Sequence, residues 1–339
     1  MSVLIIGGTG LISTAITRLL AADGHDVTCL TRGETDADLP SSVSFRRADR
    51  TDRAALADAV SDDDFDCVID MVCFDAETAR EAVAVFADRT DQYVFCSTVD
   101  VYHRPPERNP VREDASREPP VSEYAAGKAA AEDVFRAADG DAFATTIVRP
   151  WSTYGEGGPV LHTLGTGTYY IDRIRKGKPV LVHGDGTSLW GPCHRDDVAR
   201  AFVNAVGNTD AFGEAYHVTS EETMTWNQYH LRVARALDAP EPELVHVPTD
   251  QLRTALPDRT EMLVDHFQYS TVFDNAKARR DLDFAYTVPF ETGVRRTVER
   301  LEAEDRIEPW DSESDDAVID AWREATDDFA SGVSDRIDR

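Results

Sequence analysis

The sequence predicts an α/β fold: a Rossmann-type doubly wound parallel sheet followed by a smaller, C-terminal mixed α/β domain. Two features of the 339 residues support this fold class. Short apolar runs alternate with segments of helical periodicity over the first 150 residues, and a glycine-rich turn separates the first run from the first helical segment. Strands that alternate with helices form right-handed βαβ crossovers, which make the sheet parallel.

The individual elements follow from the same patterns. Apolar runs predict strands at Val3–Ile6, Val27–Thr31, Val43–Arg46, Cys67–Val72, Tyr93–Ser97 and Thr145–Val148. Apolar residues at helical spacing predict helices over 12–24, 76–90, 195–206 and 226–239, and a closing helical pair within 273–301. Between 151 and 192, glycines and turn residues predict loops with short elements.

The change in character after Pro150 defines the predicted domains. Residues 1–155 form the Rossmann domain, to which residues 190–210 return. Residues 156–303 mostly form the second domain, which we expect to bind the substrate. Residues 304–339 are very acidic and predict a loosely attached helix or a partly disordered tail.

Charge is the most unusual property of the composition. The chain carries 63 acidic and 35 basic residues, a net charge of −28. Such a charge repels phosphate backbones and anionic lipid, so we expect neither nucleic acid nor a membrane as a partner. Only four of the basic residues are lysines and the acid is spread along the chain, which resembles proteins of halophilic archaea. In molar salt the Debye length falls to about 3 Å, which screens the self-repulsion.

The sequence also predicts the compartment. No apolar run approaches the ~20 residues that span a membrane, and the N-terminus has no basic region or small-residue cleavage site of a signal peptide. The five cysteines are odd in number and lack CxxC spacing, so we interpret them as core residues in a reducing cytoplasm. The nine histidines show no HxxH or HExxH spacing, and we predict no metal site.

The glycine-rich turn is the first candidate site. Glycines let the backbone approach a pyrophosphate closely, and the helix N-terminus offers free N–H groups and the positive end of the helix dipole. The strand–turn–helix context favours this interpretation over a plain tight turn. The third glycine of the usual fingerprint is replaced by Ser13, a small residue. The candidate phosphate contacts are Gly7, Thr9, Gly10, Leu11 and Ile12.

The end of the second strand bears on the choice between NADP and NAD. An NAD site usually carries Asp or Glu here, to bind the ribose hydroxyls. In this chain Thr31 is followed by Arg32, whose guanidinium can pair with the 2′-phosphate of NADP. We expect NADP or NAD as the cofactor, with NADP slightly favoured. The alternative is that Arg32 stacks on the adenine or points into solvent, in which case it does not favour NADP. Asp49 is a candidate partner for the adenine amino group. Further predicted cofactor contacts are Arg50, Met71 and Pro150.

A second candidate site lies in the fifth strand and the segment that follows. Tyr124 and Lys128 in "SEYAAGKAAAE" are four residues apart, so both side chains share one face of a helix. With four lysines in the chain, a chance Tyr-x-x-x-Lys is expected roughly 0.1 times. Thr98 ends a parallel strand, where open α/β sheets bind ligands. Lowering the tyrosine pKa from ~10 to near 7 takes about 4 kcal/mol, which a nearby ammonium and a positive nicotinamide ring could supply.

Six motifs match one known family in their order along the chain. They are the glycine turn, "FCSTVDVY", Tyr124-x-x-x-Lys128, "VRPWSTYG", "HRDDVARA" and "DNAKARRDL". Over residues 1–303 the sequence resembles an atypical member of the extended short-chain dehydrogenase/reductases, the NAD-dependent epimerase/dehydratase group. The resemblance implies that Tyr124 is the general acid/base and that Lys128 binds the nicotinamide ribose and lowers the tyrosine pKa. It also implies that Thr98 hydrogen-bonds the reacting substrate oxygen, and that a homodimer forms through the tyrosine-bearing helix.

Departures from the family pattern concern the substrate. Val99 and Asp100 stand where dehydratases carry an Asp–Glu pair, so we do not expect dehydration. Ser152 replaces the asparagine that helps nucleotide-sugar enzymes hold their substrate, and Trp190 replaces the arginine that clamps its diphosphate. Losing such a charge-assisted contact weakens diphosphate binding by at least about 2 kcal/mol. The predicted substrate contacts are Thr98, Asp100, Trp151, Ser152 and Trp190.

These observations favour an NADP- or NAD-dependent oxidoreductase. It would exchange hydride with a secondary alcohol or hemiacetal carbon of a sugar-like molecule, such as a free pentose oxidised to its lactone. One alternative is a nucleotide-sugar 4-epimerase that keeps NAD tightly bound. Another is a non-catalytic RNA-binding protein like the chloroplast stem-loop RNA-binding proteins of the atypical branch, against which the net charge of −28 argues.

Overall fold

The computed structural model describes residues 1–35, 37–310 and 315–337. The chain forms two compact units, each built from several segments. The first unit comprises Met1–Gly158, Gly191–Thr223 and Thr271–Gly293. The second comprises Pro159–Trp190, Met224–Ser270 and Val294–Arg339.

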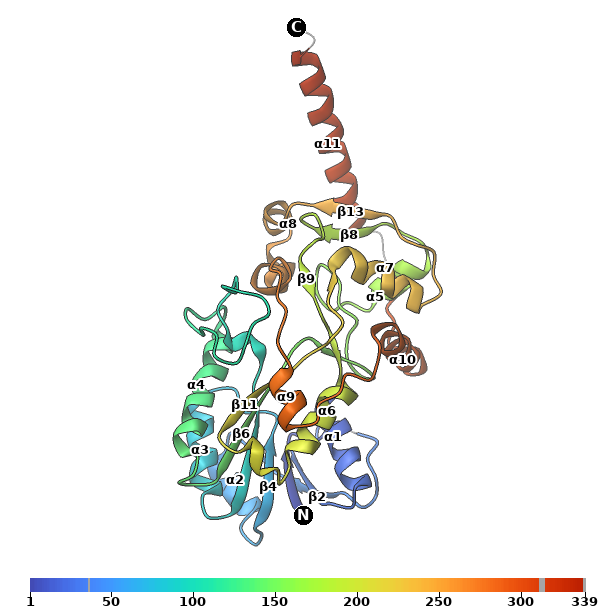
Figure 1. Cartoon of the computed structure of the whole chain (residues 1–339). Coiled ribbons are helices and arrows are strands. Elements are labelled where there is room, and N and C mark those ends of the chain that lie inside the picture. Colours follow the sequence, from blue (N-terminus) through green and yellow to red (C-terminus); the bar gives the residue numbers. More distant parts are fainter. Residues whose placement is uncertain (36, 311–314, 338–339) are drawn as a thin grey trace. The chain divides into compact units, whose positions relative to one another are not determined.

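A seven-stranded sheet forms the centre of the first unit (Figure 1). Its order is β11-β6-β5-β4-β1-β2-β3, and all neighbouring strands are parallel. The strands are β1 (Ser2–Ile6), β2 (Asp26–Thr31), β3 (Ser44–Arg47), β4 (Phe65–Asp70), β5 (Thr90–Cys96), β6 (Ala144–Pro150) and β11 (Glu214–Val218). This topology confirms the predicted fold class. The chain runs outward in opposite directions from β1 and β4, so their carboxyl ends border the crevice where such sheets bind ligands.

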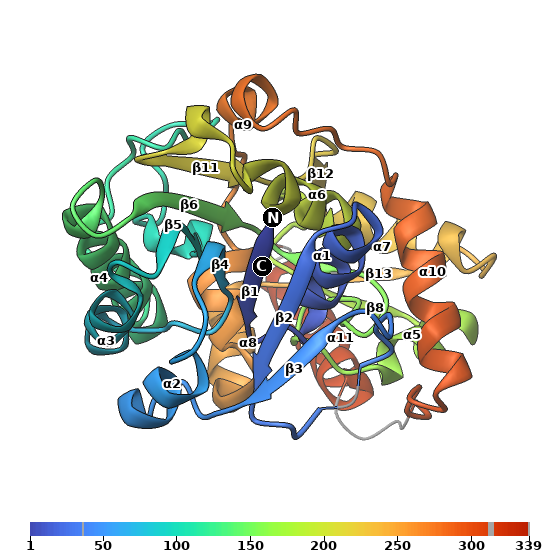
Figure 2. The same cartoon turned by 90° about the horizontal axis from the view of Figure 1, so that it is seen from below.

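Helices cover both faces of this sheet (Figure 2). The helices on one face are α1 (Leu11–Ala22) and α6 (Arg195–Ala205), and those on the other are α2 (Arg53–Ala59), α3 (Ala76–Phe86) and α4 (Glu123–Ala138). Val3 and Ile5 of β1 belong to the core beneath α1 and α6. Leu4 and Ile6 belong to the core beneath the other helices. Burial on both faces explains why the strands read as continuous apolar runs.

Two segments of the first unit lie outside the Rossmann domain proposed from the sequence. β11 pairs with β6 and completes the sheet, whereas the sequence analysis assigned residues 211–223 to the second domain. α9 (Ala276–Asp281) contacts β11, and Ala278 and Leu282 join the core beneath α1 and α6. Both segments bury apolar surface at the edge of the sheet, which explains their place in this unit. Its short elements are β7 (Thr153–Tyr154), β10 (Cys193–His194), η1 (Val99–Val101) and η2 (Thr209–Ala211).

The second unit is a smaller, mixed assembly. Its parallel strand pair is β8 (Val180–His183) with β13 (Leu244–Val247), and its antiparallel pair is β9 (Leu189–Trp190) with β12 (Met224–Thr225). Its other elements are α5 (Tyr169–Arg175), α7 (Trp226–Ala236), α8 (Thr249–Ala255), η3 (Pro257–Arg259), η4 (Leu263–Phe267) and most of α10 (Phe290–Ala303). Thr225 and Gln228 form a capping box that starts α7. This cap directs the fully buried Trp226 into the core of the unit.

Within the acidic tail, residues 315–337 form one long helix, α11 (Asp315–Ile337). Asp315 and Ile319 are buried, whereas the residues from Arg323 to Ile337 are exposed except for the partly exposed Val333. The helix therefore packs against its unit mainly through its first turns. Every helix among the described residues is too short or too polar to cross a bilayer.

Candidate functional site

The glycine-rich turn between β1 and α1 is held in a fixed shape. Gly7 adopts a φ of +84°, a conformation that favours glycine. A side chain at Gly8 would collide with the sulfur of Cys29 on β2. Ser13 occupies the place of the third glycine, where its hydroxyl donates to the Gly7 carbonyl at 2.6 Å and accepts from the Gly10 amide at 2.8 Å. The Ser13 side chain thus stabilises the conformation of the glycine-rich turn through hydrogen bonds to its backbone.

A cavity of about 420 Å³ opens above this turn. Its wall comes from the carboxyl ends of the strands around β1 and from the start of α1. The predicted cofactor residues that line it are Gly7, Thr9, Gly10, Arg32, Asp49 and Arg50. Leu11 and Ile12 form the first turn of α1, beside the cavity. A glycine cradle, free helix N–H groups and this space fit the diphosphate and adenosine of a nicotinamide dinucleotide.

The rim of the cavity carries a feature that the sequence analysis missed. Arg32 forms an ion pair with Glu34 at 2.9 Å, and both side chains are largely exposed. Glu34 also lines the cavity, so a carboxylate stands near the place expected for the adenosine ribose. Asp49 accepts hydrogen bonds from the hydroxyl and amide of Thr51 at 2.7 and 2.9 Å, which lowers its pKa and keeps an acceptor at the rim.

Arg50 lies differently from the other cavity residues. Its guanidinium is buried and pairs with Asp70 at the end of β4. It also donates to the carbonyl of Thr78 at 3.1 Å, and Asp70 accepts a second hydrogen bond from the Tyr93 hydroxyl at 2.7 Å. The charge of Arg50 therefore supports the floor of the cavity, and a direct contact with a cofactor stays a prediction.

Thr98 and Tyr124 meet at the carboxyl end of β5. Thr98 caps η1, where its hydroxyl accepts from the Asp100 amide at 3.1 Å. Tyr124 lies in the first turn of α4, which begins at the Ser122 cap, and its side chain is 46% exposed. The Thr98 side chain is within hydrogen-bonding reach of the tyrosine hydroxyl. The fold thus places Thr98 next to Tyr124.

Lys128 is the buried member of the group. It is 2% exposed, and its Nζ donates to the Cys96 carbonyl at 2.8 Å and lies 4.7 Å from the centre of the Phe74 ring. The preceding residue, Gly127, lets α4 pack closely against Phe74. Any side chain at position 127 would collide with the Phe74 carbonyl. Phe74 also lines the cavity and lies against Tyr124, with ring centres 6.3 Å apart. The tyrosine–lysine pair therefore adjoins the cavity through one aromatic ring.

The pKa of Tyr124 is raised in the cofactor-free protein, and its lowering beside a bound nicotinamide stays a prediction. Partial burial raises the pKa above its usual value although the residue is still 46% exposed, and the nearby Cys96 and Asp100 add to the rise. The hydrogen bond with Thr98 opposes them. The Lys128 ammonium lies 6.0 Å from the tyrosine ring centre and is directed at a carbonyl. In the cofactor-free protein the tyrosine therefore keeps its proton at neutral pH.

The predicted substrate contacts lie in different surroundings. Asp100 pairs with the buried Arg104 at 2.8 Å, beside Thr98. Trp151 is buried and packs edge-on against Phe273, with ring centres 4.9 Å apart. Ser152 adopts a φ of +43°, a left-handed conformation that asparagine tolerates better than serine.

Trp190 belongs to the second unit. It is 3% exposed and packs against Trp226 and Phe267, with ring centres 5.5 and 5.0 Å apart. Its indole is a core side chain there, and a contact with substrate stays a prediction. In the first unit, Met71 packs on the core beneath α1 and α6, and Pro150 ends β6.

One group of potential metal ligands occurs in the described ranges 1–35, 37–310 and 315–337. Ligand atoms of Glu156, His194 and Asp196 lie within 4.8 Å of one another. Arg195 competes with a cation at this place, because its Nε lies 3.2 Å from Glu156 Oε2. Hydrogen bonds from His194 and the charge of Arg195 outweigh burial and hold the Glu156 pKa well below its usual range. This arrangement has the character of an ion-pair network.

Comparison with known proteins identifies a family and relatives of this chain. A family model described as "NAD dependent epimerase/dehydratase family" matches residues 3–219. The 2′-dehydrokanamycin reductase of Streptomyces kanamyceticus is 31% identical over 275 residues, which cover 81% of this chain and 77% of the relative. The chloroplast stem-loop binding protein of 41 kDa b of Arabidopsis thaliana is 30% identical over 257 residues, 72% of this chain and 65% of the relative.

Solved structures share the fold. The UDP-glucose 4-epimerase of Thermus thermophilus, in complex with NAD, superposes with a TM-score of 0.69 at 23% identity over 89% of this chain and 99% of that chain. The shared fold alone does not identify a family, but the family model matches more than half of the chain and the reductase relative is 31% identical over 81% of it. This chain belongs to the NAD dependent epimerase/dehydratase family.

Proposed function

We propose that the protein is an oxidoreductase that transfers hydride between a nicotinamide cofactor and a carbon bearing a secondary hydroxyl or hemiacetal group in a sugar-like molecule. The observation that carries this proposal is the grouping of Thr98, Tyr124 and Lys128 next to the glycine turn and its cavity. The reductase relative, at 31% identity, supports the same reaction class.

The side chains have separate tasks in this reaction. A bound nicotinamide supplies or accepts the hydride and brings a positive charge when oxidised. Tyr124 holds its proton in the cofactor-free protein, so it is ready to donate to a carbonyl oxygen in the direction of reduction. Thr98 hydrogen-bonds the same substrate oxygen and fixes its place relative to the tyrosine. In the reverse direction Tyr124 removes the hydroxyl proton, and a free pentose oxidised to its lactone remains the favoured substrate type.

Turnover of free sugars tests the proposal. A panel of pentoses and hexoses with NADP and NAD in molar KCl is followed by the absorbance of the reduced cofactor. Tyr124→Phe removes the acid/base group, so we expect kcat to fall by a factor of about 10²–10⁴ while cofactor binding is retained. Tyr216→Phe is the matched control, since the Tyr216 hydroxyl donates to the Asp210 carbonyl near the edge of the sheet. A Tyr124→Phe enzyme that is as active as the control would refute the proposal.

A nucleotide-sugar 4-epimerase is the second candidate, and the matching family model supports it. An epimerase returns the hydride to the opposite face of the same substrate, so it retains NAD through purification and needs none added. Stoichiometric NAD in the purified protein, together with interconversion of UDP-hexoses, would favour this candidate over the sugar dehydrogenase.

An RNA-binding role is the third candidate because of the stem-loop binding relative. The net charge of −28 opposes phosphate binding. Binding of a stem-loop RNA at low salt would survive Tyr124→Phe, whereas hydride transfer would not. RNA binding without turnover would therefore replace the enzymatic proposal.

The cofactor and the working conditions complete the proposal. Arg32 at the cavity supports NADP as the slightly preferred cofactor, although Glu34 has to release it for a phosphate. The acidic, lysine-poor composition supports a protein adapted to high salt, where it would act as a homodimer. Light scattering in 2–3 M KCl, compared with about 0.1 M KCl, measures both the subunit number and the salt requirement.

A further inference from the structure

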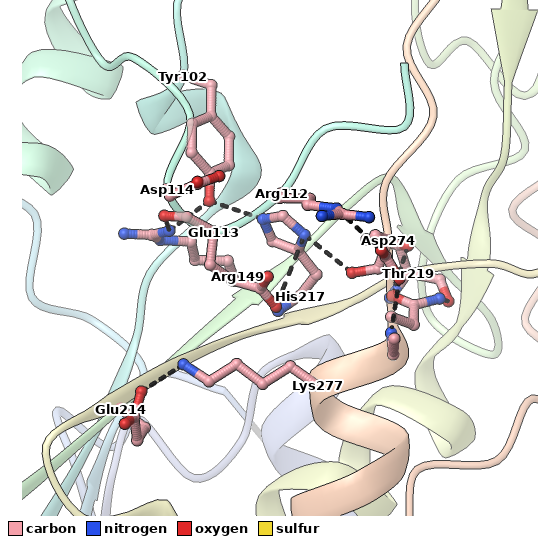
Figure 3. Close-up of polar contacts among 12 residues, drawn as sticks. Tyr102, Arg112, Glu113, Asp114, Arg149, Glu214, His217, Thr219, Asp274 and Lys277 are labelled. Atoms are coloured by element: carbon pink, nitrogen blue, oxygen red, sulfur yellow. Dashed lines mark hydrogen bonds and ion pairs between the residues drawn. The ribbon is translucent and has the colours of Figure 1, made fainter. Parts of the chain in front are cut away.

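The segment 97–102 carries Thr98 between two polar residues, Ser97 and Tyr102. Both neighbours reach the same buried ion pair, formed by Glu132 of α4 and Arg149 of β6. Figure 3 shows Arg149 beside Tyr102, and the Tyr102 hydroxyl also contacts His217. All five of these network residues are at most 3% exposed, so their contacts are shielded from water.

Glu132 belongs to the face of α4 that carries the candidate catalytic pair. Tyr124, Lys128 and Glu132 follow one another at intervals of four residues, which places them in one row on the helix. Lys128 binds the carbonyl of Cys96, and Glu132 accepts a hydrogen bond from the hydroxyl of Ser97 at 2.6 Å. Two successive residues of the β5 end are thus tied to two successive turns of α4.

The ion pair itself has a defined geometry. Arg149 donates from Nε to Glu132 Oε1 at 2.7 Å and from Nη2 to Oε2 at 2.5 Å. Burial works to raise the pKa of Glu132, but Arg149 and the hydroxyl of Ser97 outweigh it and lower the pKa. The carboxylate therefore stays ionised, and a planar two-point pair fixes the angle between α4 and β6 as well as their separation.

The other flank of Thr98 is tied through Tyr102. The hydroxyl of Tyr102 accepts from Arg149 Nη1 and lies 2.6 Å from Nε2 of His217 on β11. Because that oxygen already accepts from Arg149, the tyrosine proton is directed at the imidazole nitrogen. Burial lowers the pKa of His217 to about 3, so the ring is neutral and its Nδ1 faces the Asp274 carbonyl at 3.2 Å.

A buried ion pair of this kind adds little net stability, because desolvation cancels most of the attraction. Its geometric effect is larger, since it links β5, β6, β11 and α4 at the point where Thr98 leaves the sheet. We propose that Glu132 and Arg149 are positioning residues that hold both flanks of the 97–102 segment and thereby set the distance between the Thr98 and Tyr124 hydroxyls. This inference rests on the proposed function for its kinetic consequence, while its geometric content does not depend on the substrate.

Two conservative substitutions loosen one flank each. Ser97→Ala removes the hydroxyl that binds Glu132, and Tyr102→Phe removes the oxygen between Arg149 and His217. Thr145→Val is the matched control, because the buried Thr145 hydroxyl also joins the sheet to α4, at the Phe135 carbonyl, but at the far end of the helix. Thermal unfolding of each variant verifies that it folds.

The first readout needs no substrate. The protein is labelled with 3-fluorotyrosine, and the 19F resonance of Tyr124 is assigned by its loss in Tyr124→Phe. We expect this resonance to shift and broaden in Ser97→Ala and in Tyr102→Phe and to stay unchanged in Thr145→Val. An unchanged resonance in either flank variant, or an equal change in the control, would overturn the proposal.

The second readout is the division of the effect between kcat and KM. Misplaced hydroxyls slow proton transfer without weakening cofactor binding, so each flank variant should lose about 10-fold in kcat with the KM for cofactor within about 2-fold. Equal kcat values in the flank variants and the control would contradict the proposal. If no sugar is turned over by the unmodified protein, the proposed function fails, and the fluorine spectra still decide the positioning role.

Discussion

The two units differ in the polar groups that predominate in their interiors. The first unit buries ionised groups in pairs, Glu132 with Arg149 and Arg50 with Asp70, close to the candidate site. The second unit also buries Arg173 in a pair with Asp316, but its interior is marked by a cluster of three histidines among aromatic rings. Charged pairs fix geometry over a wide pH range, whereas neutral histidines keep a core intact only while they stay unprotonated. The difference predicts that the two units respond to different perturbations.

The histidine cluster owes its neutrality to burial. Burial lowers the pKa of His162 to about 3, of His183 to about 4, and of His230 well below its usual value. Nδ1 of His230 lies 2.7 Å from the Tyr170 hydroxyl oxygen. His183 donates from Nε2 to the Phe267 carbonyl at 3.0 Å. The other charged or titratable groups that act on the cluster are Arg173, Arg259, Asp185 and His246.

The largest expected effect comes from breaking the ion pair of the first unit. Arg149→Met leaves the buried Glu132 carboxylate with the more distant Arg117, at 3.5 Å, as its counter-charge, which should cost about 3 kcal/mol of unfolding free energy. Adding Glu132→Leu removes the stranded charge and should recover at least half of that loss. Urea denaturation measures both. Arg46→Met is the control, because the partly exposed Arg46–Asp63 pair should contribute less than about 1 kcal/mol. A double variant no more stable than Arg149→Met would contradict the assignment of the cost to charge burial.

Mild acid should act more strongly on the second unit, which buries three histidines of lowered pKa, than on the first unit, where burial lowers the pKa of His217. A histidine whose folded pKa is depressed contributes stability that is complete above its unfolded pKa of ~6.5 and is lost as the pH falls towards the folded value. Between pH 7 and 6 the contribution of each of the three histidines to the free energy of unfolding falls by about 0.7 kcal/mol, or by about 2 kcal/mol for the three together. Hydrogen exchange read by mass spectrometry should show less protection of α5 and α7 at pH 6 while the first-unit strands β4 and β5 change less.

A single substitution sharpens this comparison. His230→Asn removes one titrating group, so the remaining pH dependence between 7 and 6 should fall by about a third. His103→Asn is the control, because His103 lies in the first unit, where its Nδ1 is 2.9 Å from the Pro119 carbonyl. Equal protection of the second unit at both pH values in the unmodified protein would rule out the histidine cluster as its acid-sensitive element.

The smallest change is expected for cofactor affinity at the pair of Arg32 and Glu34. Both side chains are largely exposed, unlike the buried ion pairs and the buried histidines. Arg32→Ala removes the partner of a 2′-phosphate and should weaken NADP about 10-fold while NAD changes by less than about 2-fold. Glu34→Gln frees the guanidinium and should strengthen NADP about 3-fold. Titration of both cofactors by calorimetry measures the ratio. An unchanged NADP:NAD ratio in both variants would remove the support for NADP.

The sheet and the motif residues were accessible from the sequence because their signals are local. Apolar runs, a glycine turn and a four-residue spacing each lie within a short window, and they placed β1 to β6, Thr98, Tyr124 and Lys128 correctly in the fold. β11 was missed because its short run follows a loop-rich region and gains its place only by pairing with β6.

The supporting network was inaccessible for the same reason. Ser97 and Glu132 are 35 residues apart, and Tyr102 and His217 are 115 apart, so their hydrogen bonds depend on the finished fold. The packing of Trp190 against Trp226 was also inaccessible, because the two residues are far apart in the sequence and meet only in the folded second unit. The pKa of Tyr124 in the cofactor-free protein also depends on tertiary surroundings, which raise it, and a four-residue spacing carries no information on them.

The position of Lys128 has a practical consequence for covalent labelling. The chain has four lysines, and the ammonium of Lys128 is enclosed by the Cys96 carbonyl and the Phe74 ring. Amine-selective reagents should therefore modify the N-terminus, Lys176, Lys178 and Lys277 and spare the one amine of the candidate site. The protein could be tethered to a surface or tagged with a dye through amines while its chemistry is left free.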